Sequence, residues 1–176
     1  IDMECEHHWH GMWTSLIWHV TSWHGMWTSL TWHDGKTWHG MWSYENKLNL
    51  LNQEKVFKYL NISKPNIVII AAARVGGILA NSLNKSKFIY ENLQIQNNLI
   101  HGSYLAKVKN LMFLGSSCIY PKFSKQPIKE KYILNGPLEE TNDAYAISKI
   151  AGIMMCNNYS KNYKLNYKSL MPSNMY

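Results

Sequence analysis

Cysteines and long apolar runs are scarce in this sequence. Only three cysteines, Cys5, Cys118 and Cys156, occur among 176 residues, which gives no disulfide framework and favours a reducing, cytoplasmic location. The sequence contains no run of about 18 apolar residues and no charged-then-apolar N-terminal segment, so it predicts neither a transmembrane helix nor a secretory signal. These absences indicate a soluble protein with no membrane partner.

Clusters of basic residues are absent as well. The net charge is +7, but the lysines stand singly among Asn, Tyr and Ile and form no basic run. Such scattered charge is typical of a solvated surface rather than of a nucleic-acid-binding face. We therefore expect no nucleic-acid partner, and we note that a positive field favours anionic nucleotide ligands.

Two different compositions are joined near Tyr44. All eight Trp and seven of the eight His lie between His7 and Trp42, whereas every Asn follows Tyr44. Residues 1–43 carry four acids and one Lys, a net charge of −3, which leaves +10 for the rest of the chain. We therefore divide the chain into a His/Trp/Met segment, residues 1–43, and a domain, residues 44–176.

The N-terminal segment contains a short repeat. Trp-His-Gly-Met-Trp occurs three times, starting at Trp9, Trp23 and Trp38, and this spacing is shorter than the ~20 residues or more of a structural repeat. We interpret the segment as low-complexity sequence of uncertain structure, foreign to the native fold or disordered. Metal binding through its histidines is an alternative, and a chimeric or truncated translation product is another; we assign no metal site.

The domain alternates between helical and extended patterns. Apolar residues at helical spacing predict amphipathic helices, and the β-branched run at residues 67–70 is typical of a strand buried on both faces of a parallel sheet. Thr141 or Asn142 is placed to cap the third helix. The order strand–helix–strand–helix–strand predicts an α/β fold with a parallel sheet. From Leu48 the pattern predicts a short extended piece and then a helix that ends before Pro65. Further helices are predicted at about 86–107 and 143–159, and strands at 67–70, 111–114 and 165–171.

Small residues follow the first two strands. Three alanines and two glycines come after Ile70, and Gly-Ser-Ser-Cys comes after Leu114. Because ligands of open α/β sheets bind at the carboxyl ends of the strands, small residues there let a ligand approach the backbone. A tightly packed loop without a ligand is the alternative interpretation.

Four side chains are candidates for acid/base chemistry. Tyr145 and Lys149 stand four residues apart on one predicted helix and therefore share a face. A Tyr has a pKa near ~10, and a nearby ammonium favours the phenolate, which brings the group closer to a working acid/base range. Ser116 can donate a hydrogen bond to a substrate oxygen, and Cys118 is a candidate thiol. Their alternatives are a surface Tyr–Lys pair, a turn-forming Ser and a buried, inert Cys; Cys156 and His101 are predicted to be structural.

Four sequence blocks, taken together, resemble the GDP-L-fucose synthase family, sugar-nucleotide epimerase/reductases among the extended short-chain dehydrogenase/reductases. The resemblance covers about residues 48–176. The blocks are Ala71–Ile78, Leu114–Pro121, Tyr145–Lys149 and Met171–Tyr176.

The resemblance implies an NADPH-dependent conversion of GDP-4-dehydro-6-deoxy-D-mannose to GDP-L-fucose. Ser116, Tyr145 and Lys149 would be the catalytic trio for reduction of the 4-keto group. Cys118 would be one acid/base partner in the preceding epimerisations at C3 and C5, and the family's second partner, a His, would lie beyond Tyr176. The residues implied to bind NADP are Ala72, Ala73, Leu114, Gly115, Ser116, Ser117, Tyr145, Lys149, Pro172, Ser173, Asn174 and Met175.

Two departures from the family pattern limit the expected activity. The family's Gly-x-x-Gly-x-x-Gly phosphate loop has no counterpart here, and the family's C-terminal substrate domain would follow Tyr176. We therefore expect an incomplete Rossmann-like doubly wound sheet whose strands correspond to the fourth, fifth and sixth of the family, with an exposed strand edge. This chain would then be an inactive fragment of an enzyme that binds a nucleotide sugar and is commonly homodimeric.

Another extended short-chain nucleotide-sugar epimerase or dehydratase remains the second enzymatic hypothesis. Cys118 argues against it, because that thiol belongs to the epimerase/reductase pattern.

Overall fold

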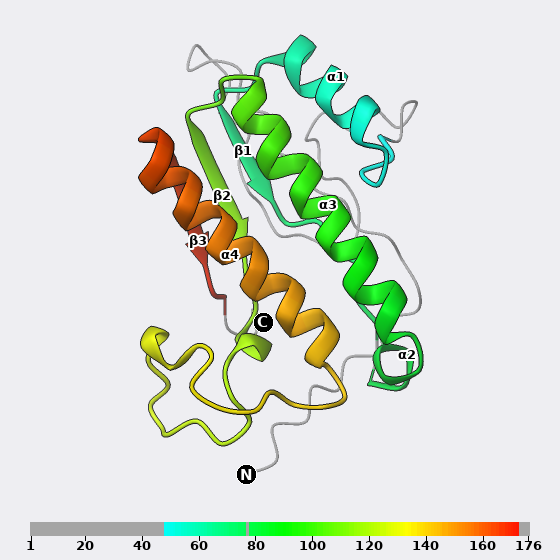
Figure 1. The fold of residues 1–176 in the computed structure, drawn as a ribbon, viewed down its shortest axis with the longest axis vertical. Coiled ribbons are helices and arrows are strands. Elements are labelled where there is room, and N and C mark those ends of the chain that lie inside the picture. Colours follow the sequence, from blue (N-terminus) through cyan, green and yellow to red (C-terminus); the bar gives the residue numbers. More distant parts are fainter. Residues whose placement is uncertain (1–47, 77, 173–176) are drawn as a thin grey trace, which may run out of the picture.

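The computed structural model describes residues 48–76 and 78–172 (Figure 1). The segment 1–43, with its proposed metal-binding histidines, lies outside the described residues, as do Ser173, Asn174 and Met175. The described elements, in chain order, are α1 (Gln53–Ser63), β1 (Ile67–Ile70), α2 (Ile78–Leu83), α3 (Lys85–Leu105), β2 (Asn110–Leu114), two short 3₁₀ turns, η1 (Ser117–Ile119) and η2 (Glu130–Tyr132), α4 (Asp143–Tyr163) and β3 (Asn166–Leu170).

The three strands form a parallel sheet in the order β1-β2-β3. Ile70 pairs with Phe113, and Leu114 pairs with Leu170, so the carboxyl ends of all three strands meet at one edge. This confirms the predicted α/β class and the adjacency of the three strands. No described strand pairs with the outer edge of β1.

Helices α3 and α4 lie side by side over one face of the sheet (Figure 1). Buried residues of the strands alternate: Val68 and Ile70 in β1, then Leu111 and Phe113 in β2. Burial of one face follows from the period of two in an extended chain. Helix α1 packs against α3 near the C-terminal end of α3, on the side of α3 away from α4.

Local signals explain where α1 begins and ends. The Asn52 side chain accepts a hydrogen bond from the Lys55 amide at 2.9 Å, which caps the first turn. The helix ends at Ser63, and its C-cap residue Lys64, immediately before Pro65, has a left-handed φ of 43°. This agrees with the predicted helix that stops before Pro65.

Close approach of α4 to the sheet depends on Gly152. A Cβ built there would lie 2.5 Å from Phe113 Cζ and 2.8 Å from Gln96 Oε1. Only a residue without a side chain permits this contact, because real Cβ atoms do not approach other heavy atoms so closely. The helix is thereby seated directly over β2.

The two residues predicted to be structural are confirmed as such. Cys156 is fully buried in the core, and burial raises the pKa of its thiol to about 12. His101 Nδ1 lies 2.8 Å from the Tyr159 hydroxyl in a group of aromatic rings between α3 and α4. Neither side chain lies at the carboxyl edge of the sheet.

Two sequence predictions need correction. Ile67 and Ile69 are only partly buried, so burial of β1 on both faces is wrong for the described residues, because α3 and α4 cover one face only. Asn142 occupies the cap position of α4, but its side chain makes no capping bond. It accepts instead from Asn81 Nδ2 at 3.1 Å, which ties α2 to the start of α4.

Candidate active site

The carboxyl edge of the sheet collects the candidate residues of β2 and α4. Leu114 ends β2, and the first turns of α4 carry Tyr145 and Lys149. Helix α4 also packs against η1, which contains Cys118. The long loop between η1 and α4 lies at this same edge of the sheet (Figure 1).

Lys149 is buried and hydrogen-bonded at the end of β2. Its side chain is 4% exposed, and its Nζ donates a hydrogen bond to the Leu114 carbonyl at 2.7 Å. The ammonium also lies 4.8 Å from the centre of the Phe113 ring, in cation–π geometry. No described carboxylate pairs with it, and burial lowers its pKa from the ordinary value of 10.5 to about 8.

Tyr145 lies one helical turn before Lys149, as predicted. The Lys149 ammonium is 5.8 Å from the centre of the Tyr145 ring. Tyr145 is half-buried, so its ring combines contact with the protein and access from outside. The predicted Tyr–Lys pair therefore exists as a spatial pair at the sheet edge and not as a surface pair on the outer face of the helix.

Ser116 and Cys118 form a tight turn after β2. The Ser116 hydroxyl accepts a hydrogen bond from the Cys118 amide at 3.4 Å, and this caps η1. The turn-forming interpretation of Ser116 is thus confirmed, and the hydroxyl keeps its proton for donation to a ligand. Cys118 is half-buried and free of any disulfide; its assignment as an acid/base thiol stays a prediction.

Gly115 has a packing function that the sequence did not reveal. Its amide donates to the Leu170 carbonyl at 2.7 Å, and an added Cβ would lie 3.2 Å from that oxygen. The residue therefore joins the ends of β2 and β3. Pro172, just beyond β3, is half-buried, and Ser117 is exposed.

Ala72 and Ala73 follow β1 at the same edge. Ala72 is 5% exposed and belongs to the core, whereas Ala73 is half-buried. Because Ile70 pairs with Phe113, the chain after β1 continues beside the end of β2. The small residues thus border the candidate site.

Sequence reasoning missed the supporting side chains of α3. Glu91, Asn92 and Gln96 are each at most 7% exposed. A signal was present for Asn92, since Phe88, Asn92 and Leu99 follow helical spacing on one face, where a polar residue needs a buried partner. Gln96 Nε2 donates to the Ser148 carbonyl at 2.7 Å, directly before Lys149 in the chain.

The described residues contain neither a cluster of metal-ligating side chains nor a membrane-crossing helix. Residues 48–76 and 78–172 contain no group of three or more His, Cys, Asp or Glu side chains placed to hold a metal ion. Within the same part of the chain, none of the helices is long and apolar enough to cross a membrane.

The fold and site together define an α/β protein whose acid/base candidates lie at the carboxyl edge of a parallel sheet. The profile of the NAD dependent epimerase/dehydratase family matches residues 24–176. The chain therefore belongs to the NAD dependent epimerase/dehydratase family.

Among individual proteins, the chain is similar to GDP-L-fucose synthases. The chain is 55% identical over 130 residues to a GDP-L-fucose synthase of Sinorhizobium fredii, covering 74% of this chain and 41% of that protein. It is 48% identical over 130 residues to a GDP-L-fucose synthase of Escherichia coli, covering 74% of this chain and 40% of that protein. The resemblance found in the four sequence blocks is confirmed, and the chain spans about two fifths of the length of these relatives.

A solved structure has a similar fold over a similar share of the chain. The GDP-mannoheptose C4 reductase MlghC of Campylobacter jejuni, solved with NADP bound, superposes with a TM-score of 0.70 at 43% identity. The match covers 73% of this chain and 41% of that one. The Rossmann-like class predicted from the sequence is thereby confirmed.

Proposed function

We propose that this chain carries the reaction centre of an NADPH-dependent epimerase/reductase that converts GDP-4-dehydro-6-deoxy-D-mannose to GDP-L-fucose. The observation that carries the proposal is the Lys149 ammonium, buried at the end of β2 and 5.8 Å from the Tyr145 ring. Support for the substrate class comes from the relatives, which are GDP-L-fucose synthases. A GDP-heptose reductase also shares the fold.

Reduction of a 4-keto group assigns one task to each side chain. NADPH, when bound, supplies a hydride to C4. The Tyr145 hydroxyl gives its proton to the carbonyl oxygen, and the nearby Lys149 ammonium stabilises the phenolate that remains. The Ser116 hydroxyl donates a hydrogen bond to the same carbonyl oxygen and so stabilises the charge that develops there.

The residues present fit the nicotinamide end of such a cofactor. Lys149 has one neutral carbonyl as its only hydrogen-bond partner among the described residues, and an ammonium carries three donors. Two donors therefore remain for ribose hydroxyls. Ala73 is half-buried at the same edge and carries only a methyl side chain, which leaves room for a flat ring. We assign Ala72, Leu114, Gly115, Ser117 and Pro172 to the same cofactor surface. The assignment of Ser173, Asn174 and Met175, which lie outside the described residues, rests on the resemblance.

Epimerisation assigns a second task to Cys118. Protons at C3 and C5 are acidic because the adjacent ketone stabilises the enolate formed when they leave. Cys118 accepts one such proton as a thiolate or returns it as a thiol, and its half-buried position next to Ser116 gives access to a substrate held by that hydroxyl.

A C4 reductase that does not epimerise is the second candidate, favoured by the 43% identity to the GDP-mannoheptose C4 reductase. The two functions differ in proton exchange with solvent. Incubation of the 4-keto substrate in D₂O with a full-length enzyme that contains this chain incorporates deuterium at C3 and C5 only if that enzyme epimerises, and Cys118→Ser should then abolish the exchange.

We further propose a cytoplasmic homodimer. Tyr90, Ile147 and Met154 on α3 and α4 are 65%, 41% and 52% exposed, and such side chains gain from burial against a second copy. Cys118 and Cys156 are free thiols, in keeping with a reducing compartment.

Calorimetric titration with NADPH tests the central assignment. Lys149→Met keeps the apolar stem and removes the donors, so we expect NADPH affinity to fall about 10- to 100-fold, the value of a charge-assisted hydrogen bond. Lys161→Met, on the exposed part of the same helix, is the matched control and should bind as wild type. Equal affinity of wild type and Lys149→Met refutes the proposal, as does wild type that binds no NADPH.

A further inference from the structure

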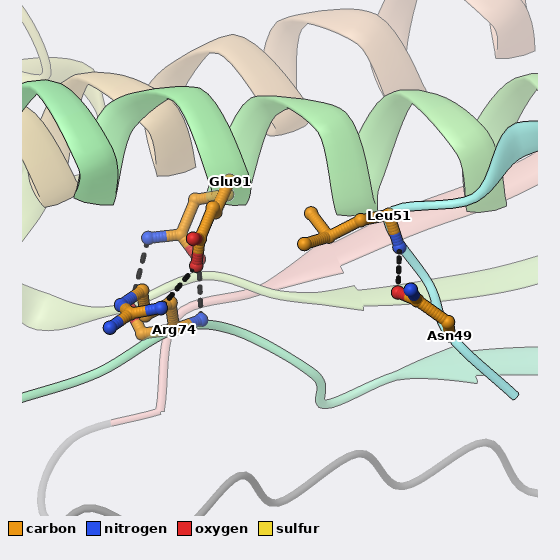
Figure 2. A network of polar contacts seen from close by, with 5 residues as sticks. Asn49, Leu51, Arg74 and Glu91 are labelled. Carbon is orange, nitrogen blue, oxygen red and sulfur yellow. Dashed lines mark hydrogen bonds and ion pairs between the residues drawn. The ribbon is translucent and has the colours of Figure 1, made fainter. Parts of the chain in front are cut away.

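Side chains of α3 bind the loop that follows β1. Figure 2 shows Glu91 projecting from this helix towards Arg74 in the loop. Arg74 Nη1 donates to Glu91 Oε2 at 2.5 Å. The Arg74 amide donates to Asn92 Oδ1 at 2.6 Å, and Asn92 Nδ2 donates to the Arg74 carbonyl at 3.0 Å. We call Arg74, Glu91 and Asn92 the Arg74 latch.

Glu91 binds the side chain of Arg74, and Asn92 binds its backbone. Asn92 is 3% exposed, and its amide satisfies the backbone N–H and C=O of Arg74 together, as a neighbouring strand would. Glu91 is 7% exposed, so its ion pair is screened less by water than a surface pair. The guanidinium also lies 5.4 Å from the centre of the Phe88 ring.

Packing adds a further contact to the same loop. A Cβ on Gly76 would lie 2.9 Å from Phe88 Cζ, so the chain at Gly76 runs against that ring. Residues 74–76 are therefore in contact with α3 through hydrogen bonds, an ion pair and van der Waals packing. A loop held in this way loses little conformational entropy when it meets a ligand.

We propose that Glu91 and Asn92 are positioning residues that fix the loop of residues 71–76 where it can receive the cofactor, an inference that rests on the proposed function. Neither residue touches the reacting atoms. They act through Arg74, whose fixed backbone sets Ala72 and Ala73 beside the end of β2. If the contacts of Arg74 with Glu91 and Asn92 are lost, residues 71–76 spend a smaller fraction of the time in the conformation that binds the cofactor. The apparent affinity for NADPH then falls in proportion to that fraction.

Asn98 provides a matched control for Asn92. It lies on the same helix, is fully buried, and donates from Nδ2 to the Leu50 carbonyl at 2.8 Å. Asn98→Ala therefore removes the same kind of buried hydrogen bond at a place away from the loop. We expect Asn92→Ala to weaken NADPH binding about tenfold and Asn98→Ala to leave it unchanged, at similar losses of stability in urea.

Hydrogen exchange measures the loop without any ligand. The Arg74 amide should exchange on the order of tenfold faster or more in Asn92→Ala than in wild type, and at the wild-type rate in Asn98→Ala. Glu91→Gln keeps an acceptor and removes the charge, so a smaller loss of NADPH affinity is expected. Its control, Glu139→Gln, breaks the exposed ion pair with Lys122 and should change nothing.

The outcomes separate this proposal from the proposed function. Equal losses of NADPH affinity in Asn92→Ala and Asn98→Ala, or unchanged exchange at Arg74 in Asn92→Ala, overturn the positioning role. Wild type that binds no NADPH overturns the proposed function. In that case the exchange rate of the Arg74 amide alone tests the positioning role. Faster exchange in Asn92→Ala but not in Asn98→Ala supports this role, and equal exchange rates in the two variants overturn it.

Discussion

Replacement of Lys149 by Met should change how the stability of this chain depends on pH. The lysine is 4% exposed, and among the described residues its only hydrogen bond goes to the Leu114 carbonyl, without a carboxylate partner. Burying an unpaired ammonium disfavours the charged form. Met has a similar apolar stem and no charge, so the variant removes the titration while it retains most of the packing.

The magnitude follows from the pKa of Lys149, which burial lowers from 10.5 to about 8. Each pKa unit corresponds to about 1.4 kcal/mol, so the charged side chain costs the folded state about 3 kcal/mol below pH 8. Between about pH 8 and 10.5 the unfolded chain still binds this proton and the folded chain does not. The free energy of unfolding therefore rises with pH through this window.

Urea unfolding followed by circular dichroism measures the effect at about pH 7 and about pH 9.5. Wild type should gain about 2 kcal/mol relative to Lys149→Met over this interval. The lost hydrogen bond to Leu114 shifts the variant equally at both pH values. Burial also raises the pKa of Tyr167, but this tyrosine is present in both proteins and cancels. A difference that stays constant, or falls with pH, would falsify the inference that Lys149 is buried and unpaired.

Three further predictions concern the packing of α4 and the sheet. Gly152→Ala places a Cβ 2.5 Å from Phe113 Cζ, and we expect a loss of about 1–3 kcal/mol in the free energy of unfolding, measured by urea denaturation. Tyr167→Phe removes the hydrogen bond from a fully buried hydroxyl to the Val108 carbonyl at 3.0 Å, and this should cost about 1–3 kcal/mol in the same assay. Cys156, fully buried with its pKa raised to about 12, should resist a thiol reagent at neutral pH until urea unfolds the chain, as followed by peptide mass spectrometry.

Matched variants separate these effects from general damage. Asn157→Ala and Tyr163→Phe, both at exposed positions of α4, should change the free energy of unfolding by about 0.5 kcal/mol or less. Cys118, which is half-buried, should react before Cys156. A Gly152→Ala protein as stable as wild type, a neutral Tyr167→Phe, or simultaneous labelling of both thiols would each contradict the packing described.

Much of the fold could be predicted because its signals are local. The β-branched run at Ile67–Ile70 favours a strand through its side-chain type, and the apolar stripe of α3 favours a helix through its period of 3.6 residues. Tyr145 and Lys149 were assigned to one face for the same reason. The assignments of Ser116, Cys118, Tyr145 and Lys149 to catalysis, and of residues 1–43 to a separate segment, stay predictions.

The sequence by itself determined the order of the three strands and the three long helices, the likeness to GDP-L-fucose synthases and the four-residue spacing of Tyr145 and Lys149, but it did not predict α2. Only the tertiary structure decided that Lys149 is buried against Leu114, 35 residues away in the chain, and that α3 holds Arg74. Desolvation and hydrogen-bond partners depend on elements that are distant in sequence and meet only when the sheet is assembled. The pKa of Lys149 and the position of the loop after β1 are therefore properties of the fold.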